Sequence, residues 1–318
     1  MFRTPYTDGN AAADAKDRCR KLEEAFADKR CVCMVDQHSC LWNYDLLKFS
    51  LPLPCVYRMT RLRTRTGCDV SVNLVMSPGK DGKMTQPARM TYMVREGTGS
   101  AAGAVSPKGV GVSDPHGFDT LFYPPGPISM NGVEVFCYSD QLGFKSVLFP
   151  SCAISLHFQP DGYAGVYSRN FTDDYTYSRN FLCGDCDGGK GEMGMLGSDV
   201  IRRMRTWEDR TAAMLMYTSR HIVGGDRQCT NHAAIMNSCP ANTAFRANQV
   251  CGCILSSDSN TGRCMRKRMS SRDLTSMYYA CVEQYCTGNG SGFSSGGCNM
   301  IRETVGAQNC PLPDRFSC

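Results

Sequence analysis

The sequence predicts an α+β protein. A β-rich central region, sandwich- or barrel-like, is expected between an N-terminal helix and a helical, disulfide-rich C-terminal module. Short aromatic strands separated by Pro, Gly and Asp turns recur over residues 119–182, a spacing typical of sandwiches and barrels. Helix-forming residues dominate 11–30 and 198–222. Ten of the twenty cysteines fall between Cys229 and Cys318.

We expect three regions: an N-terminal helix and Cys-rich lead-in over 1–55, a β-rich domain over 56–196, and a helix plus disulfide-stapled Cys-rich module over 197–318. Within residues 11–30, Leu22, Ala25 and Phe26 lie on one helical face. The apolar run over 41–55 ends in prolines at 52 and 54, which exclude a helix there.

Residues 58–77 alternate in polarity, with Arg61, Arg63 and Arg65 on one face. The turn sequence PGKDGK at 78–83 predicts a hairpin onto a strand over 90–96. An arginine row of this kind is typical of a solvated sheet face or an interface rim. Phosphates or an acidic partner are the alternative, so the three arginines form a candidate interface.

Residues 97–118 are rich in Gly, Ala, Ser and Pro and have no helical or strand period. They predict a loop, which would be a linker, an arm or a segment docked on a neighbour. The aromatic segments after it predict six strands, over 119–123, 133–139, 145–149, 153–158, 162–168 and 176–181.

Cys183 and Cys186 form a CxxC pair that a glycine-rich segment follows. A redox dithiol and a zinc knuckle are alternatives there, and a structural disulfide corner is the simplest interpretation. Residues 198–222 predict the longest helix, with Ser198 as N-cap and Gly224 and Gly225 ending it.

The polar segments between the C-terminal cysteines bury too little apolar surface to offset the entropy of ordering them. Disulfides would compensate at about 2–4 kcal/mol each. Zinc remains an alternative, although the Cys-x-Cys pairs are shorter than the usual zinc spacing. The disulfide candidates are Cys31, Cys33, Cys183, Cys186, Cys229, Cys239, Cys251, Cys253, Cys264, Cys281, Cys286, Cys298, Cys310 and Cys318.

Several function classes find no support in the sequence. The net charge of +5 is too mild to indicate nucleic acid. The five histidines form no HExxH pattern and no GxSxG elbow stands out, so we predict no catalytic residue, no metal site and no cofactor. No run reaches the roughly 18 apolar residues that span a bilayer. The N-terminus shows no secretory signal, and Phe2 stands where myristoylation requires glycine.

The spacing of the C-terminal cysteines resembles the framework of membrane-associated virion proteins of nucleocytoplasmic large DNA viruses. Relatives of that group include the myristoylated entry–fusion proteins of poxviruses. The resemblance covers about 90 of 318 residues, and the chain departs from it at Phe2 and by stopping at Cys318. The matching positions are Met236, Cys239, Cys251, Cys253, Ile254, Cys281, Cys286, Cys298, Asn309, Cys310 and Pro311.

This resemblance implies a non-enzymatic structural component of a large DNA virus particle. It would be a minor capsid protein that bridges capsomers or links the shell to the inner membrane. Its partners would be the major capsid protein and other minor capsid proteins, with peripheral contact to the inner viral membrane and no nucleic acid. Such a protein would reside in the virion, assembled in the host cytoplasm, where viral thiol oxidases form its disulfides. The alternatives are an extracellular carbohydrate- or protein-binding β module and a zinc-dependent nucleic-acid binder or enzyme.

Overall fold

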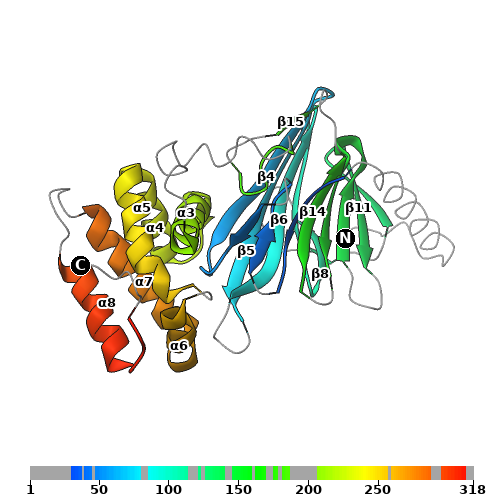
Figure 1. Cartoon of the computed structure of the whole chain (residues 1–318). Helices are drawn as coiled ribbons and strands as arrows, with labels where there is room; N and C mark the ends of the chain where they lie inside the picture. Colours follow the sequence, from blue (N-terminus) through cyan, green and yellow to red (C-terminus); the bar gives the residue numbers. More distant parts are fainter. Residues whose placement is uncertain are drawn as a thin grey trace.

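The structure is a computed structural model of the 318-residue chain. It describes residues 30–37, 39–44, 47–79, 85–113, 121–122, 126–139, 145–159, 162–169, 175–177, 181–186, 206–256, 259–287 and 295–312. Two antiparallel sheets stand beside a group of helices, which gather at one end of the sheets (Figure 1). The predicted α+β class is confirmed, whereas the helix expected over 11–30 lies outside the described residues.

The first sheet is eight-stranded and antiparallel throughout. The predicted strands over 133–139, 145–149, 153–158 and 162–168 all lie in it. Residues 30–50, expected as a lead-in, supply its last three strands. The strand order is β10 (Gly126–Met130), β11 (Val133–Ser139), β12 (Lys145–Phe149), β13 (Ile154–Phe158), β14 (Ala164–Arg169), β1 (Arg30–Val35), β2 (Cys40–Trp42) and β3 (Lys48–Ser50).

The second sheet is built around three long strands, β4 to β6. The predicted hairpin at 78–83 joins β5 to β6. The alternating run over 58–77 is two strands rather than one, because the chain turns at Gly67, whose φ is +90°. The order is β15 (Tyr175–Tyr177), β4 (Val56–Thr64), β5 (Cys68–Pro78), β6 (Thr85–Glu96), β7 (Gly99–Ser106), β8 (Gly109–Ser113) and β9 (Leu121–Phe122), and β16 (Ile222–Gly224) also pairs with β4.

The two sheets pack face to face as a sandwich, with β12 and β13 against β7 and β8. Alternation explains how the sequence forms this core, since every second residue of β5 is buried. Val70, Val72 and Leu74 are all 0% exposed, and Leu156 and Val166 of the first sheet are equally buried.

The prediction of a loop over 97–118 is wrong for residues 99–113, which form the antiparallel pair β7 and β8. Small residues are required there because Tyr92 of β6 lies across these strands and its hydroxyl donates to the carbonyl of Gly111 over 3.1 Å. A Cβ on Gly103 would lie 2.1 Å from that carbonyl oxygen and 2.4 Å from the Tyr92 hydroxyl. The Gly and Ala content therefore reflects close packing in a sheet.

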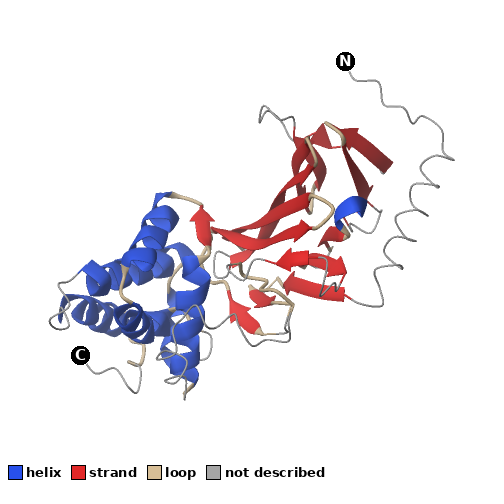
Figure 2. Ribbon diagram, turned by 90° about the horizontal axis from the view of Figure 1, so that it is seen from above, coloured by secondary structure: helices blue, strands red, loops and turns tan. Residues whose placement is uncertain are grey.

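The C-terminal region is helical, as predicted, and forms a bundle in which α7 contacts α4, α5, α6 and α8. Figure 2 shows this bundle at one end of the strands. Its helices are α3 (Trp207–Arg220), α4 (Arg227–Ser238), α5 (Ala241–Cys251), α6 (Asn260–Arg268), α7 (Ser271–Thr287) and α8 (Ser295–Ala307), and the 3-10 turn η3 (Gly252–Ile254) follows α5.

The first helix of the bundle begins later than predicted. Its N-cap is Thr206, whose hydroxyl accepts a bond from the backbone N–H of Asp209 while the Asp209 carboxylate accepts the Thr206 N–H. This capping box fixes the start at Trp207 and corrects the predicted cap at Ser198, which lies outside the described residues. The helix ends at Arg220, two residues before the predicted end, because β16 begins at Ile222.

Candidate functional site

Disulfides tie the sandwich together at three places. Cys31 and Cys33 of β1 bond to Cys186 and Cys183, so the Cys-x-Cys and CxxC motifs pair with each other. Cys68 at the start of β5 bonds to Cys152 in the 3-10 turn η1 (Pro150–Cys152), between β12 and β13, and so joins the two sheets. The CxxC motif is thus structural, but its two cysteines bond to β1 rather than to each other.

Three further disulfides lie within the helical bundle. Each one joins segments that are close in the chain, at separations of 47, 30 and 46 residues. They connect the end of α4 to α7, the end of α5 to α7, and α6 to the segment after α8. The pairs are Cys239–Cys286, Cys251–Cys281 and Cys264–Cys310.

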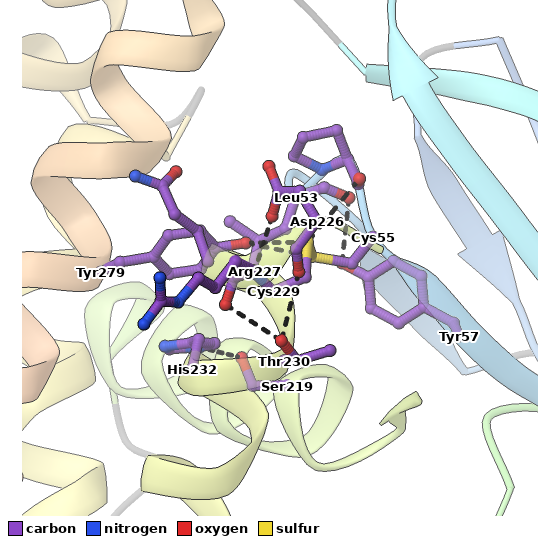
Figure 3. The surroundings of a disulfide bond; sticks show 12 residues. Leu53, Cys55, Tyr57, Ser219, Asp226, Arg227, Cys229, Thr230, His232 and Tyr279 are labelled. Carbon is purple, nitrogen blue, oxygen red and sulfur yellow. Dashed lines mark hydrogen bonds between the residues drawn. A yellow bond between two sulfur atoms is a disulfide. The ribbon is translucent and has the colours of Figure 1, made fainter. Parts of the chain in front are cut away.

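One disulfide joins the sandwich to the bundle. Cys55, just before β4, bonds to Cys229 in the first turn of α4, at a separation of 174 residues (Figure 3). Both cysteines are completely buried. Asp226 caps α4 by accepting the backbone N–H of Cys229 over 2.9 Å. The Tyr279 hydroxyl of α7 lies 3.0 Å from Cys55 Sγ and 3.5 Å from Cys229 Sγ, which places the bond between both parts of the molecule.

Most of the cysteines that the sequence predicts to form disulfides are paired in the structure, but not all of them. Cys253 is corrected, because it is a free thiol, buried and donating to the carbonyl of Val250 over 2.9 Å. Sequence reasoning missed Cys55, Cys68 and Cys152, which stand alone rather than in a motif. The side chain of Cys298, and Cys318 altogether, lie outside the described residues. The paired candidates are Cys31, Cys33, Cys183, Cys186, Cys229, Cys239, Cys251, Cys264, Cys281, Cys286 and Cys310.

The candidate arginine interface is partly neutralised by the protein itself. Arg61 binds Asp69 through two nitrogens at 2.8 and 2.6 Å, and Arg63 adds a bond of 3.0 Å to the same carboxylate. The Arg61 hydrogen bond holds the pKa of Asp69 below its usual value. Arg65 lies beyond the end of β4 and is exposed. These contacts match a solvated sheet face more closely than a phosphate site.

The bundle interior contains a buried polar cluster. His232 of α4 lies 3.1 Å from the Ser219 hydroxyl through Nε2, and its Nδ1 has no hydrogen-bond partner among the described residues. Tyr278 of α7 donates to Asn248 of α5 over 2.6 Å. Burial lowers the pKa of His232 to about 3 and raises that of Tyr278. His232 is therefore neutral at physiological pH and contributes packing rather than charge.

A cleft of about 370 Å³ lies where the bundle meets the sandwich. Its floor is apolar and includes Phe49 of β3, Leu215 of α3 and Leu274 of α7. Phe49 is held in place by stacking on Tyr217, with ring centroids 4.9 Å apart. Lys48 and Arg266 also line the cleft. The remaining lining residues are Ser39, Cys40, Ser50, Pro52, Thr85, Thr211, Met214, Leu255, Ser256, Ser271 and Thr275.

The described residues offer little for nucleophilic or metal chemistry. Burial raises the pKa of the Cys253 thiol to about 12, so it is not a thiolate nucleophile at neutral pH. Within the described ranges, His, Cys, Asp and Glu side chains nowhere gather in threes that could hold a metal ion. The Cys-x-Cys pairs weighed as zinc ligands contribute Cys31, Cys33 and Cys251 to disulfides instead.

No protein-family model and no curated protein matches this sequence. In the part of the chain that the structure describes, no helix has both the length and the apolar character needed to cross a bilayer.

Proposed function

We propose that the chain is a non-enzymatic structural component of a large DNA virus particle, a minor capsid protein that bridges capsomers or links the shell to the inner membrane. The observation that carries the proposal is the disulfide network. Within the part of the chain that the structure describes, seven disulfides hold the sandwich, the bundle and the junction between them. The C-terminal cysteine spacing, which resembles that of virion proteins of large DNA viruses, supports the same conclusion.

In this role the protein acts through rigid contact surfaces. The cross-links lower the entropy of the unfolded chain, which favours the folded state of both parts without a partner. Cys55–Cys229 fixes the bundle against the sandwich. A partner that binds one part is therefore held in a fixed position relative to the other part. The partners would be the major capsid protein and other minor capsid proteins.

The test is to find the protein in particles. Quantitative mass spectrometry of purified virions, with protease treatment before and after detergent, should recover the chain at a fixed ratio to the major capsid protein. Non-reducing gels of the same particles should show it oxidised. Recovery only from the medium of uninfected cells would contradict the proposal.

A second candidate is an extracellular module that binds carbohydrate or protein, which the cleft at the junction favours. Secretion separates the two candidates. An extracellular module should be recovered from the medium with its disulfides formed in the secretory pathway, and a virion component should be oxidised only where a cytoplasmic thiol oxidase is present.

A further inference from the structure

The cleft at the junction is built at an open edge of a sheet. β3 is the last strand of the first sheet, with β2 on one side and no strand on the other among the described residues. Lys48, Phe49 and Ser50 all line the cleft. Because side chains alternate between faces along a strand, a cleft that meets three consecutive residues runs along the strand's edge.

The hydrogen bonds of β3 identify which backbone groups face this edge. The carbonyl of Leu47 accepts from the N–H of Asn43, and the N–H of Leu51 donates to the carbonyl of Ser39. Bonding alternates along an antiparallel strand, so Leu47, Phe49 and Leu51 point their backbone groups at β2. The N–H and C=O groups of Lys48 and Ser50 therefore point away from the sheet. Such an unpaired row is a template for another extended chain.

The charged side chains that line the cleft indicate the kind of segment that it binds. Among the described residues, Lys48 and Arg266 are the charged members of its lining, and no Asp or Glu of that part of the chain contributes to it. The Arg266 guanidinium is held at the cleft by donating to the carbonyl of Leu255. The N-terminal turns of α7 contribute the polar side chains of Ser271 and Thr275 to the lining.

The buried hydroxyl of Thr275 is a second, independent observation that points to a ligand in the cleft. The Thr275 side chain is 3% exposed, and its hydroxyl has no hydrogen-bond partner among the described residues. Burying a hydroxyl without a hydrogen-bond partner is unfavourable, so a polar group in the cleft would be bound favourably. Phe49, Leu215 and Leu274 would cover the apolar side chains of the same occupant.

We propose that this cleft binds an extended, acidic segment of a partner protein, which pairs with the outer edge of β3. Its backbone bonds to Lys48 and Ser50, its carboxylates lie near Lys48 and Arg266, and its apolar side chains pack on the cleft floor. The inference goes beyond the proposed function and does not depend on it, because either a virion protein or an extracellular module would use the same edge.

The experiment uses the oxidised full chain and a phage library of random peptides of about ten residues, the upper length of an ordinary strand. Enriched peptides should alternate Asp or Glu with apolar residues. Their synthetic versions are then titrated against variants of the protein by fluorescence anisotropy.

Lys48→Glu should weaken peptide binding by about tenfold, because it reverses a charge at the cleft. Lys267→Glu is the matched control, since Lys267 is exposed beside Arg266 but does not line the cleft, and it should change affinity by less than about threefold.

A backbone pair of variants tests the pairing with β3. Ser50→Pro removes the outward N–H and should weaken binding by about tenfold, the effect of about 1.4 kcal/mol. Ser50→Ala keeps that N–H and should bind as the parent does. Thermal unfolding and the disulfide map of each variant verify that it is folded.

Three outcomes would overturn the proposal: no enriched peptide, enriched peptides without acidic residues, or binding that Lys48→Glu and Ser50→Pro leave unchanged. A small anion that copurifies and blocks the peptides, detected by native mass spectrometry, would also replace the partner segment as the occupant.

Discussion

The sandwich and the helical bundle are stabilised by different means. The sandwich buries aliphatic side chains on two facing sheets, and its disulfides close loops of 84, 150 and 155 residues. The bundle consists of helices of 9 to 17 residues with His232, Asn248 and Thr275 buried among them, and its disulfides close loops of 30, 46 and 47 residues. Both parts have apolar cores, since Met236, Phe245 and Val282 of the bundle are buried as well. The difference between them therefore lies in the cross-links, which close long loops in the sandwich and join neighbouring segments of the chain in the bundle.

Removing all three bundle disulfides should have the largest effect. The chain-entropy relation gives about 4 kcal/mol for each loop, or about 12 kcal/mol together, which is comparable to the whole stability of a typical domain. Serine at all six cysteines should therefore unfold the bundle and leave the sandwich folded.

The chain has two tryptophans, Trp42 in β2 and Trp207 in α3. Variants with one tryptophan each would report the two parts separately by fluorescence. Loss of both signals together would contradict the comparison.

Removing the bond between the two parts should come next. Cys55→Ser with Cys229→Ser opens a loop of 174 residues and should lower the free energy of unfolding by about 5 kcal/mol. Urea unfolding should then show separate transitions for Trp42 and Trp207, where the parent shows one. Coincident transitions in the variant would mean that noncovalent contacts alone couple the bundle to the sandwich.

Acid should destabilise the protein through His232 of the bundle. Its folded pKa of about 3 is below the ordinary value of 6.5, so the unfolded state binds a proton between these values and the folded state does not. Stability is therefore present above about pH 6.5 and is lost as the pH falls, by about 2 kcal/mol between pH 7 and pH 5. Urea unfolding followed at Trp207 measures this loss, and His232→Gln should remove that part of the pH dependence. An unchanged pH dependence in His232→Gln would contradict the assignment.

The smallest effect is expected from removing one of the two disulfides that join β1 to Cys183 and Cys186. Cys31→Ser with Cys186→Ser leaves Cys33–Cys183 closing almost the same loop. The cost should be about 1 kcal/mol, because only a few residues gain freedom. Removing both pairs should cost about 5 kcal/mol, measured by the same urea titration. Equal costs for the single and double removals would show that the two bonds do not constrain the same loop.

The sequence predicts the parts of the fold that have a local period. β11 to β14 carry aromatic and branched residues between turn residues, and the β5–β6 hairpin has its turn signal. β7 and β8 lack that signal because Gly and Ala contribute little hydrophobicity, although Tyr92 requires small residues there. The Thr206 cap was missed because a helical pattern continues upstream of it.

The cross-links and the cleft depend on contacts between distant segments. Cys55, Cys68 and Cys152 belong to no motif, and their partners are 84 to 174 residues away. Cys253 sits beside a bonded cysteine in the same motif yet points to Val250. The cleft brings together β3, α3 and α7. No spacing rule relates such segments, because their proximity is set by the packing of the whole fold.

Peptide mapping by mass spectrometry under non-reducing conditions tests the central claim most directly. Alkylation of the native protein should leave Cys253 unmodified because it is buried, and digestion should release a Cys55–Cys229 cross-linked peptide together with the three bundle pairs. Alkylation of Cys55 and Cys229 before reduction, or their recovery with other partners, would contradict the claim that a disulfide joins the bundle to the sandwich.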